Sequence, residues 1–452
     1  MISTRLLTHW ESLRTSFWFI PSIMVCVATG LAKLLLIFDH YGYQAPAKFL
    51  QFFYETSPES ARALLTTIAN SMITVTSIAF SITVVALTLA SSQFGPRLIR
   101  NFMMDKGTQV VLGVFVSTYL YCLLIIQATK SFDKQVFVPG MSVYVAVILA
   151  FVSVAVLIFF IHHVARSIQA DNVIDNVYCE LRESIDCLFP DIEESDEDSN
   201  MHSLQYQQYQ QNYPSRFEIK TPESGYVQAL DLDHIVSMGQ KFDMVVEVKF
   251  KPGDFIIKNS VLLVVYCHSN QLPLVEDKLL QVIIQGSNRT PVQDPEFAIH
   301  QLVEIAVRAL SPGINDPYSA ITCVDKLSAI LCELCTRPFP NSSRFDDSGA
   351  IRVTINGIKF SGLAEAAFNQ IRQYGKGSVA VTIRLLESLD NLVQASINDE
   401  QREFAGHQLQ MIEQAQAGQS LPTGDQADIA QGVDKIKASL SRKGLVTGHT
   451  NV

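Results

Sequence analysis

The sequence predicts a polytopic α-helical membrane protein with four transmembrane helices and a cytoplasmic α+β region. Hydrophobic residues make up 48% of the 452 residues and charged residues only 17%, a low charged share for a soluble protein of this size. The apolar excess lies almost entirely before residue 163. After it, strand-like and then helix-like patterns indicate a small β barrel-sandwich-like module followed by a mostly helical domain.

Four apolar segments define the membrane domain, residues 1–163. Each approaches the roughly 20 residues that a helix needs to cross the hydrocarbon core. The first is not expected to be a cleaved signal peptide, because its apolar run is too long and no small-x-small cleavage site precedes a mature start. The segments are Phe17–Phe38, Leu64–Ala90, Val110–Ala128 and Met141–Ile161.

The loop charges predict the orientation. Cytoplasmic loops carry an excess of Lys and Arg. One side of the predicted membrane domain has six of these residues and the other side has four. Both termini are therefore expected in the cytoplasm, and the eight scattered cysteines fit a reducing compartment. The six are Arg5, Arg14, Arg97, Arg100, Lys106 and Arg166, and the four are Lys48, Arg62, Lys130 and Lys134.

The second span carries a polar stripe. It contains ten Ser, Thr or Asn residues and no charge, and at 100° per residue most of them fall within an arc of about 100°. The stripe indicates either close helix packing or the wall of a water-filled path, and the sequence leaves both open. The candidate residues are Asn70, Thr74, Ser77, Ser81 and Thr88.

A connector at 164–216 is expected to continue the last span as a helix and then form an acidic, Gln-rich mobile loop. Residues 217–271 follow as a small β module, with strands predicted near 225–230, 244–250, 255–257 and 261–266. The run G-Y-V-Q…P-G-D-F-I…L-L-V-V resembles a barrel-sandwich half-motif of the lipoyl/biotinyl type. The carrier versions place a lysine on the next turn, where this chain has Tyr266-Cys267-His268-Ser269-Asn270, so no cofactor is expected.

The helical domain, 272–417, contains a candidate polar site. Pro312 and Gly313 end one helix, and Asp316 is placed to cap the next. Glu296, His300 and Glu304 recur at steps of four, which suits either a metal site or a solvated helix face. The candidate polar residues are Arg289, Asp294, His300, Arg308, Asn315 and Asp316.

The rest of this domain is expected to hold a short hairpin over residues 351–360, with a type I′ turn at Asn356-Gly357. Three further helices should reach about residue 416, with Ser378 and Asp399 as caps. Residues 418–452 are expected to form a polar tail with one weakly amphipathic stretch around 429–440.

The chain resembles a family of bacterial predicted membrane proteins grouped as a domain of unknown function. The resemblance rests on residues 72–97, on 225–257, and above all on R-T-P-V-Q-D-P-E-F-A-I-H-Q-L-V-E-I-A-V-R-A-L-S-P-G-I-N-D-P-Y-S-A at 289–320. It implies a bacterial inner-membrane protein with this four-span layout, and it carries over no catalytic residues.

Three functional hypotheses follow. No catalytic motif, Walker sequence or second C-x-x-C is present, and the net charge of −10 argues against nucleic acid as a partner. The first hypothesis is a homo-oligomeric channel or transport-type protein with a cytoplasmic gating or sensing region. The second is a membrane-anchored interaction or sensory module that binds a cytoplasmic protein or small ligand. The third is a metal- or ligand-dependent enzyme using Asp294, His300, Asn315 and Asp316.

Overall fold

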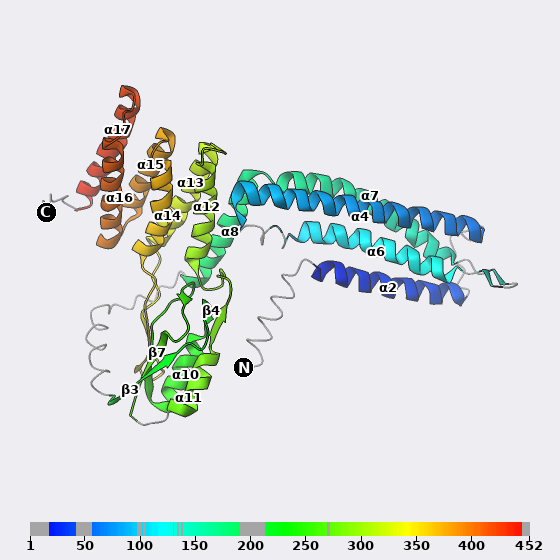
Figure 1. Ribbon diagram of the computed structural model, residues 1–452, viewed down its shortest axis with the longest axis horizontal. Helices are drawn as coiled ribbons and strands as arrows, with labels where there is room; N and C mark the ends of the chain where they lie inside the picture. The colour runs from blue at the N-terminus through cyan, green and yellow to red at the C-terminus, as the bar shows by residue number, and fades with distance from the viewer. Residues whose placement is uncertain are drawn as a thin grey trace. The chain divides into compact units, whose positions relative to one another are not determined.

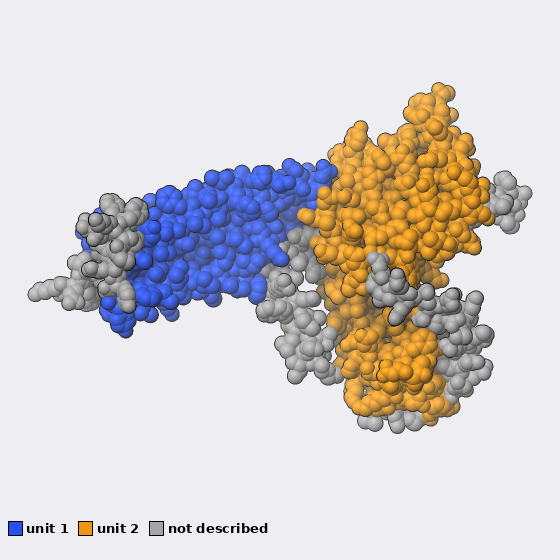
Figure 2. Space-filling view, turned by 180° about the vertical axis from the view of Figure 1, so that it is seen from behind, with its two compact units in different colours: residues 1–173 blue, residues 174–452 orange. Residues whose placement is uncertain are grey.

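The computed structural model describes residues 18–41, 57–96, 102, 105–129, 131–132, 135–136, 139–189, 213–268 and 272–444. The chain forms two compact units, residues 1–173 and 174–452 (Figure 2). Most of the acidic, Gln-rich loop lies outside the described residues, as do most of the charges behind the predicted orientation.

The first unit is a bundle of long helices (Figure 1). Within the described residues four helices are long and apolar enough to cross a membrane, and they confirm the four predicted segments as helices. The longest has 37 residues, about 55 Å at 1.5 Å per residue. The elements are α2 Phe19–His40, α4 Pro58–Phe94, α6 Lys106–Ala128, α7 Gly140–Ser167 and the short strands β1 Ser131–Phe132 and β2 Gln135–Val136.

Polar residues fix the helix ends in this unit. Asp105 caps α6 by accepting hydrogen bonds from the backbone of Gly107 and Thr108. Asp39, near the end of α2, accepts from the backbone N–H groups of Met141 and Ser142 at 3.1 and 3.0 Å. A carboxylate from one helix thus satisfies the free donors at the start of another.

The β region of the second unit consists of two sheets (Figure 1). A five-stranded sheet has the order β3-β7-β5-β10-β9, in which only β5 and β10 run parallel, and a three-stranded sheet has the order β6-β4-β8. Helices α10 Leu232–Phe242 and α11 Leu272–Gln281 accompany them. The strands are β3 Ser215–Lys220, β4 Gly225–Leu230, β5 Met244–Val248, β6 Phe255–Ile256, β7 Val261–Cys267, β8 Ile283–Gly286, β9 Ser343–Phe345 and β10 Ile351–Ile355.

The predicted strands of the β module are present, but a barrel-sandwich is not confirmed. Strands from 343–355 complete the larger sheet, so the β structure is not contained within 217–271. The predicted hairpin over 351–360 is wrong. β10 pairs with β5 and β9, while Phe360 begins α14 and packs against the rings of Phe339 and Phe404. The apolar run after Gly357 therefore starts a core helix rather than a second strand.

Six helices of the second unit stack as three successive hairpins in two layers (Figure 1). One layer contains α12, α14 and α16, and the other contains α13, α15 and α17. Their bounds are α12 Pro295–Ala309, α13 Pro317–Leu334, α14 Phe360–Gly375, α15 Val379–Ala395, α16 Asp399–Ala417 and α17 Thr423–Arg442. We call this stack the helical array.

Helix α8, Ala170–Leu188, is separate from α7 rather than continuous with it. Its apolar face is buried, and charged contacts join it to α13 and to the residues just after α13. Asp175 pairs with Lys326 at 2.8 Å, and Asp186 pairs with Arg337 at 2.6 Å. α8 therefore joins the helical array beside α13.

The caps were predicted with mixed success. Asp316 caps α13 as predicted, accepting from the backbone of Ser319 at 3.2 Å, with Pro317 at the first helical position. Ser378 stands at the N-cap of α15 but its side chain makes no capping bond. At α16 the cap is Asn398, which forms a reciprocal capping box with Gln401. Asp399 is therefore the first helical residue and not the cap.

The segment expected to be a polar tail contains α17, which packs against α15. Its apolar residues at intervals of three and four are buried. Ser439 and Lys435 both bind Asp390 of α15, at 2.8 and 2.9 Å. The buried apolar residues are Ile429, Val433, Ile436 and Leu440.

Candidate functional sites

The polar stripe of α4 lies on the outside of the first unit. All five candidates, Asn70, Thr74, Ser77, Ser81 and Thr88, are exposed. At 100° per residue the buried face of α4 is centred roughly opposite them. That buried face consists of Ala61, Leu65, Ala69, Met72, Ala79, Thr83, Ala90 and Phe94. The apolar side of α4 thus packs inward, and its polar side is directed away from the described helices.

Most hydroxyl groups of the stripe are satisfied by their own helix. Thr74 donates to the carbonyl of Asn70 at 2.8 Å, Ser77 to Ile73 at 3.0 Å and Thr88 to Val84 at 2.9 Å. Such back-bonding lowers the cost of placing a hydroxyl in lipid. An Asn amide has two donors and an acceptor. Asn70 is therefore the residue of the stripe that most needs a polar surface beyond the described part of the chain.

The predicted polar site divides into two groups at opposite ends of α12. At the first end, Arg289 binds both carboxylate oxygens of Asp294, with Nη2 at 2.9 Å from Oδ1. Nη1 of the Arg289 guanidinium lies 3.4 Å from Nδ1 of His300. Asp294 is only 2% exposed and caps α12 through the backbone N–H of Phe297. Three of the six predicted residues therefore meet.

Glu296 and Lys251 belong to the same group and were not predicted as its members. Glu296 accepts from Nζ of Lys251 at 2.5 Å and from Arg289 at 3.3 Å. Burial raises the pKa of Glu296, but these cations outweigh it and the pKa is lowered overall. Lys251 follows β5, far from α12 in sequence, so no local pattern could indicate the pairing.

Gln293 and Gly253 complete the junction between the β region and α12. The side chain of Gln293 accepts from the backbone N–H of Leu230 at 2.9 Å and donates to its carbonyl at 3.2 Å. Gly253 has a φ of 94°, and a Cβ there would lie 2.3 Å from Oδ2 of Asp294. The Q-D-P-E part of the sequence motif thus joins the sheet to the helix, a structural role for residues proposed as a site.

Arg308, Asn315 and Asp316 lie at the other end of α12. The rise from Asp294 to Arg308 is about 20 Å at 1.5 Å per residue, so they cannot form one site with Arg289. Arg308 approaches Glu304 to 3.5 Å, and Asn315 adopts a left-handed conformation with φ of 50°. Among the described residues no group of three His, Cys, Asp or Glu side chains is arranged to hold a metal ion.

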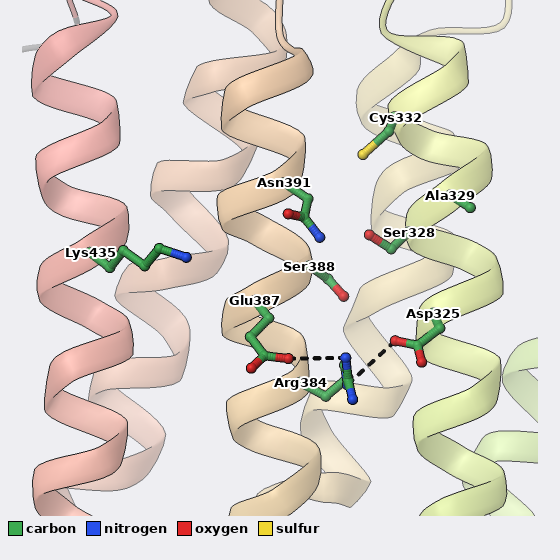
Figure 3. A pocket seen from close by; sticks show the side chains of 9 residues that line it. All are labelled: Asp325, Ser328, Ala329, Cys332, Arg384, Glu387, Ser388, Asn391 and Lys435. Atoms are coloured by element: carbon green, nitrogen blue, oxygen red, sulfur yellow. Dashed lines mark ion pairs between the residues drawn. The ribbon is translucent and has the colours of Figure 1, made fainter.

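A shallow depression of about 550 Å³ lies between α13 and α15. Figure 3 shows Arg384 reaching from α15 toward Asp325 of α13, and it pairs with Asp325 at 3.4 Å and with Glu387 at 3.1 Å. The depression is also lined by Ser328, Ala329, Cys332, Ser388, Asn391 and Lys435. No local sequence pattern indicated this depression, because its residues come from three helices.

Residues 14–391 match the family model described as "Predicted membrane protein (DUF2254)". The chain belongs to this family. It is 28% identical over 446 residues to the uncharacterized proteins Rv1290c of Mycobacterium tuberculosis (strain H37Rv) and Mb1321c of Mycobacterium bovis. The alignments cover 96% of this chain and 83% of each relative. No solved structure matches the chain. The resemblance inferred from the 289–320 stretch is thereby confirmed.

Proposed function

We propose that this member of the family forms a homo-oligomeric channel in the bacterial inner membrane, with both termini in the cytoplasm. In this proposal α4 of each subunit faces a central axis, and the second unit gates or senses. The supporting observation is the outward polar stripe, because a polar face gains nothing from contact with lipid alone. A ring of such faces around a symmetry axis would enclose polar side chains and water.

The charge at one end of α4 agrees with a polar path. Glu59 lies eleven residues before Asn70, about three helical turns, and is exposed on the same face. Arg62 does not share that face, since its guanidinium donates to the carbonyl of Thr129 at 2.5 Å. The stripe would therefore begin at an acidic ring, which favours cations over anions.

The test is ion flux through liposomes containing the purified full-length protein. Ser77→Trp places a large ring on the proposed axis, and Ile158→Trp places the same ring on an exposed apolar position of α7. We expect Ser77→Trp to lower flux at least tenfold and Ile158→Trp to change it less than about twofold, since only the first narrows the path. Mass photometry on both variants checks that the oligomer persists.

The hypothesis of a membrane-anchored module predicts that the wild-type protein conducts no ions. If the wild-type protein is monomeric and conducts no ions under any gating condition, α4 serves only as an anchor and the channel proposal fails. An oligomer without flux would mean that the stripe packs helix against helix between subunits. The depression between α13 and α15 (Figure 3) is then the surface at which to seek a cytoplasmic ligand.

A further inference from the structure

One end of the helical array exposes apolar side chains that its core does not use. The segment from Ser311 to Tyr318, which we call the α12–α13 turn, presents Ile314 at 40% and Tyr318 at 79% exposure. Tyr374, at the end of α14, is 63% exposed. It belongs to the same end, because a Cβ on the adjacent Gly375 would lie 3.5 Å from Leu310, just after α12.

Helix α8 runs parallel to helix α13. This arrangement gives the position of the α12–α13 turn along α8. Asp175 meets Lys326, and eleven residues later in both segments Asp186 meets Arg337. Lys326 stands nine residues after the start of α13, about 14 Å, and Asp175 five residues after the start of α8, about 8 Å. The α12–α13 turn therefore lies beside the first turn of α8 or slightly beyond it.

Chain connectivity relates the start of α8 to the membrane. α7 ends at Ser167 and α8 begins at Ala170, so only residues 168 and 169 intervene, and the ends of the two helices are at most about 11 Å apart. If α7 crosses the bilayer, the first turn of α8 stays close to the surface at which α7 emerges, whatever the angle between the helices.

We propose that the α12–α13 turn docks on the lipid bilayer, with Ile314 and Tyr318 inserted at the headgroup level. Tyrosine favours this level because its ring is apolar and its hydroxyl is hydrated. The cap Asp316 does not oppose insertion, since its carboxylate is directed into its own helix, accepting from Ser319 at 2.5 and 3.2 Å. Lys376, exposed at the neighbouring α14–α15 turn, supplies a cation for lipid phosphates. The proposal requires α7 to span the membrane but does not require a channel.

The test is quenching of a single tryptophan by brominated lipid in the full-length protein. The sequence has only two tryptophans, Trp10 and Trp18, and replacing both by Phe gives a silent background. Tyr318→Trp reports on the turn. Ile397→Trp is the matched control, because Ile397 is also a large hydrophobic residue and is 64% exposed, but it lies in the α15–α16 turn at the opposite end of the array.

Nanodiscs with phosphatidylcholine brominated near the headgroup should quench the tryptophan at 318 at least threefold more than the one at 397. Its emission should also shift to the blue relative to 397, as expected at a membrane interface. Equal, weak quenching at both positions overturns the proposal. Weak quenching at 318 together with protection from aqueous acrylamide also overturns it, because protein rather than lipid then covers the turn. Ile314→Trp provides a second probe and should behave as Tyr318→Trp does.

Discussion

Arg289 and Asp294 form a bidentate ion pair, and the Asp294 carboxylate also caps α12. Asp294 is 2% exposed and Arg289 is 23% exposed at the side chain. The pair lies where the β region meets the helical array, since Lys251 reaches it from the strand side through Glu296. It therefore joins the two parts of the second unit.

Arg289→Ala should destabilise the second unit by about 3–5 kcal/mol, because it leaves a buried carboxylate without its charge partner. Urea unfolding in detergent, followed by far-UV circular dichroism, measures the loss. Arg384→Ala is the matched control. The side chains of Arg384 and Asp325 are 41% and 48% exposed. Loss of this ion pair should therefore lower the free energy of unfolding by less than about 1 kcal/mol. Equal effects from both substitutions would contradict a structural role specific to Arg289.

Gly253→Ala should destabilise the same junction by roughly 1–3 kcal/mol. The backbone there has a φ of 94°, which L residues adopt at a cost, and the added Cβ would displace the Asp294 carboxylate. Gly313→Ala is the control, since nothing lies within 4 Å of a Cβ at that position. Thermal unfolding of both variants in nanodiscs distinguishes them, and an unchanged midpoint for Gly253→Ala would contradict the close packing.

Asp346 should contribute stability that is lost in acid. Hydrogen bonds from Ser348 and the guanidinium of Arg352 hold the pKa of its carboxyl well below the usual range. Because the folded pKa is below the unfolded value of about 3.9, the contribution is complete above about pH 5 and disappears as pH falls through 4 and below.

Melting temperatures measured from pH 7 to pH 3 test this linkage. Asp346→Asn should be less stable than the wild type at pH 7 and should lose less additional stability between pH 5 and pH 3. Asp347→Asn, at the adjacent exposed position, should keep the wild-type slope. A slope in Asp346→Asn as steep as that of the wild type would assign the acid loss to other carboxylates.

Ile436→Ala should destabilise the helical array by about 2–5 kcal/mol, the usual cost of a large-to-small change in a core. Ile436 is fully buried between α17 and its neighbours. Lys437→Ala removes a side chain that is 47% exposed and should cost less than about 1 kcal/mol. A negligible effect of Ile436→Ala on the unfolding midpoint would mean that α17 is dispensable, as a polar tail would be.

Local chemistry made several elements predictable. Four long apolar runs predicted four helices, because each is apolar over about the length of a bilayer core, with Lys33 the one charge inside the predicted spans. Asp316-Pro317 marked a helix start, because a side-chain acceptor followed by proline suits the free N–H groups of a first turn. The misplaced cap at Asp399 shows the limit of such patterns, since Asn398 and Asp399 are both good caps and only the chain geometry chooses between them.

Contacts between distant residues were not predictable from the sequence. β10 pairs in parallel with β5 about a hundred residues earlier, whereas the adjacent Asn356-Gly357 favoured a local hairpin. The six candidate polar residues divide into two groups for a related reason. Arg289 and Arg308 are close in sequence, but a rigid helix separates them, and Lys251 enters from a different part of the chain.

Hydrophobicity and periodicity are local properties, and they were enough to predict the four apolar helices, most helices of the array and the polar stripe on α4. The packing of the folded chain was needed to show that this stripe points outward and that the Q-D-P-E residues join a sheet to a helix. The direction of a face depends on which surface packs inward. For α4 the small and apolar residues around Ala69 and Ala79 pack into the bundle, and Asn70, Ser77 and Ser81 remain on its surface.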